Sequence, residues 1–68
     1  MKYEQFLTLT KKELAQLLVN ISGQIRAENK ININGWEISL PEQVEVELEY
    51  KEKGKRSKFE IELRWPTT

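Results

Sequence analysis

The chain has 68 residues, of which 38% are hydrophobic and 32% are charged, and its formal net charge is zero. A chain this short is expected to form one domain, spanning residues 1–68, with a small core and modest stability. Zero net charge gives no overall electrostatic attraction to nucleic acid or to a membrane surface. No segment has the length of a membrane span, and no apolar run of signal-peptide length begins the sequence, so we expect no membrane partner.

Histidine, cysteine and aspartate are all absent. Their absence excludes histidine-based acid–base chemistry, cysteine nucleophiles and the usual zinc sites. We therefore expect a protein that is not an enzyme, with no catalytic residue, no metal ligand and no cofactor. A small chain without disulfides must rely on packing alone, which fits the reducing cytoplasm, and we expect a cytoplasmic location.

The first predicted element is a short strand over residues 3–7, and a helix follows it. Thr10 can cap this helix, and Glu13 can reach back to the Thr10 amide to complete a capping box. The helix is expected to run to about Glu28, with Asn29 as a left-handed stop.

One apolar stripe runs along the predicted helix, at spacings of three and four residues. It comprises Leu14, Leu17, Leu18, Ile21 and Ile25. Gly23 inside the helix costs about 1 kcal/mol relative to alanine. We interpret it as a point where the helix approaches a sheet closely.

The next segment predicts a tight hairpin around Asn34-Gly35, because both central residues of such a turn need positive φ. A two-residue turn pairs Ile33 with Trp36 and Ile31 with Ile38. These four side chains then share one face of the hairpin.

A second, longer hairpin is predicted by strict alternation, which indicates strands with one buried and one wet face. Its apolar positions are Val44, Val46, Leu48, Tyr50, Phe59, Ile61, Leu63 and Trp65. Glutamates dominate the alternate positions, which we expect to form a solvated outer face. Gly54 supplies the turn, but its central pair is either Lys53-Gly54 or Gly54-Lys55.

The fold expected from these elements is α+β, in two layers. One amphipathic helix packs on one face of a four- or five-stranded antiparallel sheet, in the order β-α-β-β-β-β, because each apolar face needs a partner. In that arrangement Trp36 and Trp65 face the helix, and their default role is in the core.

The spacing of several residues is similar to that of a known family. Leu40-Pro41, alternating Val and Glu from Val44 to Glu49, and a closing Trp65-Pro66 resemble the amphi-Trp domain family. The resemblance runs from about residue 3 to residue 66 and implies a small amphipathic fold. It implies no mechanism, because the family has no established activity or catalytic residues. Members are often strongly acidic, whereas this chain is neutral and has a basic turn.

Two candidate binding surfaces remain. Trp36 lies next to a turn and Trp65 at a strand end, so a ring edge of each can contact a protein. The turn over residues 51–58 is basic and can contact phosphate, although an ordinary charged turn explains it as well. Its candidate binding residues are Lys53, Lys55, Arg56 and Lys58. We expect a protein-interaction module, with an unknown protein or a second copy bound through a sheet edge. The alternative is weak binding of nucleic acid or phosphate.

Overall fold

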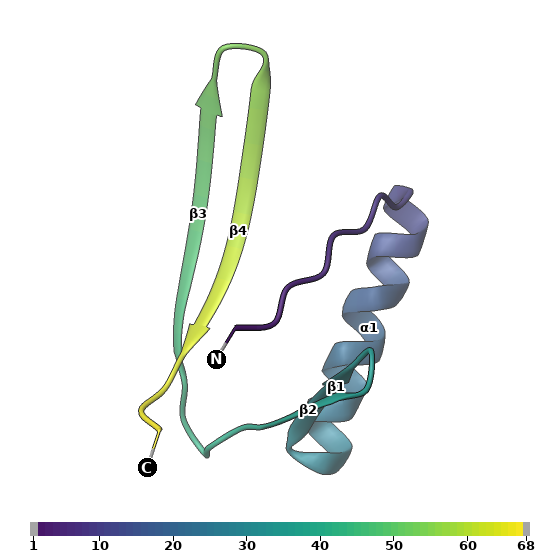
Figure 1. Cartoon of the computed structure of the whole chain (residues 1–68), viewed down its shortest axis with the longest axis vertical. Coiled ribbons are helices and arrows are strands. Elements are labelled where there is room, and N and C mark those ends of the chain that lie inside the picture. Colours follow the sequence, from purple (N-terminus) through teal and green to yellow (C-terminus); the bar gives the residue numbers. More distant parts are fainter. Residues whose placement is uncertain (1, 68) are drawn as a thin grey trace.

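The computed structural model describes residues 2–67 of the chain and contains one helix and four strands. In chain order these are α1 (Lys11–Glu28), β1 (Lys30–Ile33), β2 (Trp36–Ser39), β3 (Glu45–Lys53) and β4 (Arg56–Arg64). The strands form two separate two-stranded antiparallel sheets, β1–β2 and β3–β4 (Figure 1). The α+β class is confirmed, whereas the prediction of one four- or five-stranded sheet is wrong.

Helix α1 begins and ends where the capping residues predict. The Glu13 amide donates to the Thr10 hydroxyl at 3.1 Å, and the Thr10 amide donates to the Glu13 carboxylate at 2.9 Å. At the other end Asn29 is left-handed, with φ 57°, and its amide donates to the Ile25 carbonyl. The capping box and the asparagine stop are therefore confirmed.

The sequence analysis interpreted Gly23 as a point where the helix approaches a sheet closely, and this interpretation is wrong. A Cβ atom built at this position would have no atom within 4 Å. On a helix with 3.6 residues per turn, Gly23 lies about 180° from Leu14 and thus opposite the apolar stripe. Its cost to helix stability therefore has no compensation in packing.

The short hairpin β1–β2 forms around Asn34 and Gly35, with φ of 52° and 83°. Its register pairs Ile33 with Trp36 and Ile31 with Ile38, as predicted. The hairpin packs against the C-terminal half of α1 (Figure 1). A hydrogen bond of 2.6 Å from the Asn32 amide to the Gln24 side chain fixes it there.

The long hairpin β3–β4 turns at Gly54-Lys55, which settles the register that the sequence left open. Lys53 pairs with Arg56, and Gly54 has φ 59°. The two common two-residue hairpin turns, types I′ and II′, both need positive φ at the first central position. Lysine there would incur the left-handed penalty of about 1–2 kcal/mol, whereas glycine does not, so Gly54 occupies that position.

The long hairpin stands apart from the helix, and this is why a single sheet does not form (Figure 1). Among the described residues, no Cα atom of β3 or β4 comes within 8 Å of α1 or of the short hairpin. Residues 40–44 connect β2 to β3, and Pro41 within them has no amide to continue a ladder. The chain therefore leaves the first sheet before the second begins.

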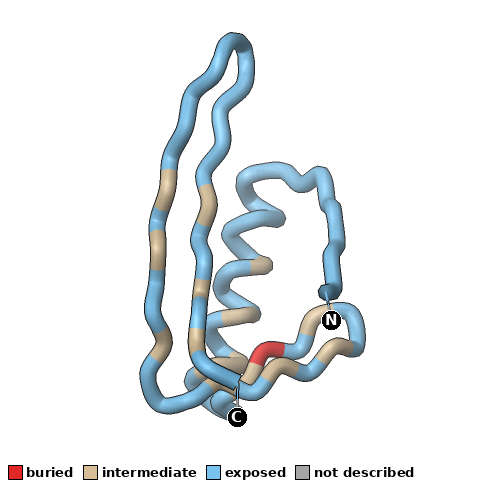
Figure 2. The backbone as a smooth tube through the Cα atoms, turned by 60° about the vertical axis from the view of Figure 1, so that its left-hand side comes forward, coloured by how far each residue is buried: buried red, intermediate tan, exposed pale blue. Residues whose placement is uncertain are grey.

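The predicted first strand over residues 3–7 is also wrong, because these residues pair with no strand. They instead run back along α1 toward the short hairpin (Figure 2). The ring of Tyr3 packs against that of Trp36, with centroids 4.6 Å apart and planes tilted by 42°.

The core of a single chain is very small. Within residues 2–67, Ile31 is the one buried apolar residue, at 7% exposure (Figure 2). The radius of gyration is 13.8 Å, whereas a compact chain of this length has a value of about 11 Å. The long hairpin accounts for this shape, because in the part of the chain that the structure describes it meets the rest of the molecule only at its open end, where Val44 and Leu63 line a groove with Ile25.

Candidate protein-docking face

One side of the long hairpin carries a continuous row of large apolar side chains, which we call the hairpin face. It comprises Val46, Leu48, Tyr50, Phe59 and Ile61. Antiparallel pairing places Leu48 opposite Ile61 and Tyr50 opposite Phe59. Such cross-strand pairs stabilise a hairpin by about 0.2–1 kcal/mol each, so the face also helps to hold its own strands together.

The hairpin face is open to solvent, contrary to the prediction that these residues form the core. Its five side chains are between 53% and 64% exposed. Together they present on the order of 500 Å² of apolar surface, near the upper end of the largest patch on a typical monomer. Scattered exposed apolar residues are ordinary, whereas the largest contiguous patch on a monomer is often functional, which makes the hairpin face the candidate site.

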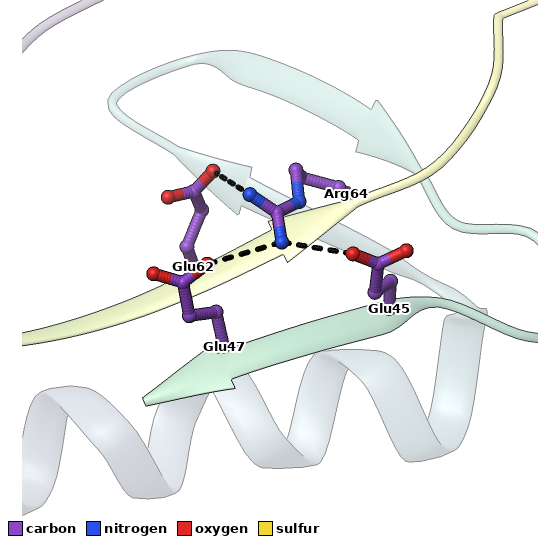
Figure 3. A network of polar contacts seen from close by, with 4 residues as sticks. All are labelled: Glu45, Glu47, Glu62 and Arg64. Carbon is purple, nitrogen blue, oxygen red and sulfur yellow. Dashed lines mark hydrogen bonds and ion pairs between the residues drawn. The ribbon is translucent and has the colours of Figure 1, made fainter. Parts of the chain in front are cut away.

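The opposite side of the same hairpin is polar and is organised around Arg64 (Figure 3). Its guanidinium donates to the carboxylates of Glu45 at 2.8 Å, and of Glu47 and Glu62 at 3.1 Å. Hydrogen bonds to Glu45 and Glu47, with the negative charge nearby, raise the pKa of Arg64. One cation thus offsets three carboxylates at the open end of the hairpin.

Further along this polar side, like charges lie directly opposite each other. Glu49 pairs with Glu60, and Lys51 pairs with Lys58. The compensating contacts run along each strand, at 2.8 Å between Lys51 and Glu49 and at 3.0 Å between Lys58 and Glu60. The hydrogen bond and charge of Lys51 lower the pKa of Glu49, and the same contact raises the pKa of Lys51.

These contacts leave the hairpin with its usual burial reversed. Glu47, Glu49 and Glu60 on the polar side are half-buried. The side chains of the hairpin face, on the other side of the same strands, are exposed. Figure 2 shows the alternation of half-buried and exposed positions along both strands. The apolar side of the long hairpin is therefore the side that a single chain leaves uncovered.

Trp36 lies in β2, whereas Trp65 directly follows β4, and both are half-buried. Trp36 lines a groove of about 410 Å³ with Tyr3, Leu17 and Ile38. Trp65 follows β4 and lines a separate groove beside Val44 and Pro66. Part of each ring is therefore open to solvent, and the two rings do not form one site.

The basic turn presents fewer free charges than the sequence suggested. Lys58 is bound to Glu60. Within residues 2–67, Lys53, Lys55 and Arg56 form no ion pair, and all three are exposed. Within the basic turn, the free positive charge is thus confined to the tip of the hairpin.

The glutamates do not converge on a cation site. In the described part of the chain, no three histidine, cysteine, aspartate or glutamate side chains lie together in a way that could hold a metal ion. Its single helix is too polar to serve as a membrane span.

Sequence comparison then places the chain in a family. The model of the Amphi-Trp domain matches residues 1–68. The chain belongs to the Amphi-Trp domain family. The match confirms the resemblance noted in the sequence, and it carries a domain type without an activity, a substrate or a partner. Comparison with curated proteins and with solved structures gave no match.

The hairpin face is the feature that sequence reasoning misjudged. The alternation identified its residues correctly but assigned them to an internal core. The difference in strand length was the available signal. Strands of four residues in the first hairpin and nine in the second cannot be matched along their full length in one sheet.

Proposed function

We propose that this Amphi-Trp domain is a non-catalytic protein-interaction module whose docking surface is the hairpin face. The observation that carries the proposal is the exposure of Val46, Leu48, Tyr50, Phe59 and Ile61 on one side of an otherwise well-paired hairpin. A patch of this area costs about 12 kcal/mol when it stays in water, at 25 cal/mol per Å². A partner that covers it recovers the part of that free energy that remains after the entropy cost of association.

The chemistry of the chain supports a non-catalytic role. With no histidine, cysteine or aspartate, proton transfer and nucleophilic attack would fall to glutamate, lysine, serine, threonine or tyrosine. Five glutamates of the long hairpin are engaged with Arg64, Lys51 or Lys58 on a flat strand surface, and Glu52 accepts a hydrogen bond from the Tyr50 hydroxyl. We place the domain in the cytoplasm, because a cysteine-free chain suits that compartment.

Site-specific photo-crosslinking in cells that express the protein tests this function. A benzophenone amino acid replaces Tyr50, on the hairpin face, or Lys51, on the polar face one residue away. We expect a discrete protein adduct from position 50 and little from position 51. Equal yields at both positions, or no protein adduct from position 50, would overturn the proposal.

A second candidate function is weak phosphate binding by the hairpin tip, which the free charges of Lys53, Lys55 and Arg56 favour. Three phosphate contacts predict a slope of about −2.7 in log K against log salt, and so a loss of about 40-fold between 50 and 200 mM. Titration of the labelled protein with a short duplex and with a single strand, followed by amide NMR, measures this slope. Shifts that are absent, or that persist unchanged in salt, would exclude phosphate binding at the tip.

A further inference from the structure

We infer that the partner of the hairpin face is a second copy of this chain, and that each hairpin covers the helix α1 of the other copy. This inference rests on the docking function proposed above and names its occupant. Three observations carry it: the surface area of one chain, a second apolar surface that matches the hairpin face, and the connector between the two.

A single copy exposes too much surface for a folded chain of its size. Its accessible surface is 6742 Å², whereas a folded 8.1 kDa protein exposes about 4,500 Å². The excess is thus about 2,200 Å² for each chain. Two chains together carry about twice that excess, which lies within the range of roughly 2,000–5,000 Å² that permanent dimers bury.

The chain itself carries the surface that the hairpin face fits. Leu14 and Leu18 on the N-terminal half of α1 are each 47% exposed. The short hairpin covers only the other half of the helix, because its strands are about 13 Å long and α1 is about 27 Å long. The strands β3 and β4 are about 30 Å long, which matches the full length of α1.

The connector directs the hairpin away from its own helix. Residues 40–44 join β2 to β3, and Pro41 restricts both its own backbone and that of Leu40. No Cα atom of β3 or β4 lies within 8 Å of the helix of the same chain. Short hinge loops under strain favour the exchange of an element between two copies.

A reciprocal exchange satisfies both chains at once. The hairpin of each copy covers α1 of the other, so the arrangement has two-fold symmetry and closes without open ends. The polar side with Arg64 stays in water on the outside. The net charge of zero leaves no overall repulsion between copies.

Complementary charges on the two surfaces test this inference. Leu48→Lys places a cation on the hairpin face, and Leu18→Glu places an anion on the exposed side of α1. The masses of the wild type, of each variant, of their 1:1 mixture and of a chain carrying both changes are measured by sedimentation equilibrium. Glu47→Gln on the polar side serves as the matched control.

We expect the wild type and the control to sediment at twice the 8.1 kDa mass of one chain. Each single variant should dissociate at least ten-fold more readily. Their mixture should recover dimers, because one interface then pairs Lys with Glu and the other is unchanged. Recovery also shows that neither variant has simply failed to fold.

Four results would overturn the inference. In the first, the wild type stays at 8.1 kDa, and in the second, the Leu18→Glu variant dimerises as the wild type does. In the third, dimers recover only when both changes are in one chain. In the fourth, the 1:1 mixture of the two variants recovers no dimers. The photo-crosslink at position 50 separates the two proposals. An adduct with a different protein leaves the docking function standing and excludes the second copy, whereas no adduct excludes both.

Discussion

The loss of unfolding free energy caused by Leu48→Ala distinguishes a hairpin face that is open to solvent from one that is covered. In a single chain Leu48 is 64% exposed, so only about a third of its side chain is out of water. Full burial of a leucine is worth about 1.5–3 kcal/mol. Leu48→Ala in an open hairpin should therefore cost about 0.5–1 kcal/mol.

A covered hairpin face predicts a larger cost. When a leucine is packed on all sides, truncation to alanine removes its transfer free energy and leaves a cavity, at about 2–5 kcal/mol. The proposal that a second copy covers the face therefore predicts a loss of about 2–4 kcal/mol per chain. The two ranges do not overlap, so one measurement distinguishes them.

Urea unfolding measures this loss, followed by circular dichroism and by the fluorescence of Trp36 and Trp65. Wild type and variant are unfolded at two protein concentrations that differ ten-fold. Because the folded chain binds a second copy and the unfolded chain does not, the urea midpoint of the wild type should rise with protein concentration. The difference between the two proteins then gives the free energy of unfolding lost.

Val19→Ala is the control, because Val19 is 62% exposed and lies on the helix away from the apolar stripe. Its truncation should be neutral, or slightly stabilising through helix propensity. A cost for Leu48→Ala below about 1 kcal/mol, with midpoints independent of concentration, would refute the reasoning that the hairpin face is covered.

Three further predictions concern the helix. Thr10→Ala removes the acceptor for the Glu13 amide and should lower the free energy of unfolding, measured by thermal unfolding, by about 1 kcal/mol. The control Thr8→Ala lies outside the cap and should cost little. Equal effects of the two changes would contradict the assigned cap. Glu13→Gln keeps the capping hydrogen bond but removes the charge. Because hydrogen bonds from the Thr10 backbone and hydroxyl lower the pKa of Glu13 below its ordinary 4.5, wild type should exceed this variant in melting temperature above that pH. The advantage should fade as the pH falls below 4.5, and a pH-independent difference would refute this. Gly23→Ala has open space around it and should stabilise the protein by about 0.5–1 kcal/mol; destabilisation would show that something packs there.

The local features of the fold could be predicted because their causes lie within a few residues. Thr10 and Glu13 satisfy the free amides of a helix end, and Asn34-Gly35 tolerates the positive φ of a tight turn. The alternation of the long hairpin likewise depends only on the two-residue period of a strand. Each of these predictions needed no knowledge of distant parts of the chain.

The register of the long hairpin depends on competing terms that the pattern alone does not rank. The alternative turn would have opposed Glu49 to Lys58, which is better than the observed pairing with Glu60. That gain is a fraction of a kcal/mol, whereas lysine at positive φ costs about 1–2 kcal/mol. The backbone of the turn therefore decides the register over the charges.

The arrangement of the two hairpins could not be predicted, because an apolar face specifies that it must be covered but not by which chain. The sequence analysis assumed that the helix and the long hairpin of one chain cover each other. Pro41 and the short connector instead separate them. If the second copy is the partner, the predicted helix–sheet contact is correct in kind and occurs between chains.

The most direct test of this account is an isotope-filtered NOE experiment on an equal mixture of labelled and unlabelled protein, unfolded and refolded together. The account predicts NOEs between the ring protons of Phe59 in one chain and the methyl groups of Leu14 and Leu18 in the other. The same NOEs within one chain alone, or no contact between the long hairpin and α1, would contradict it.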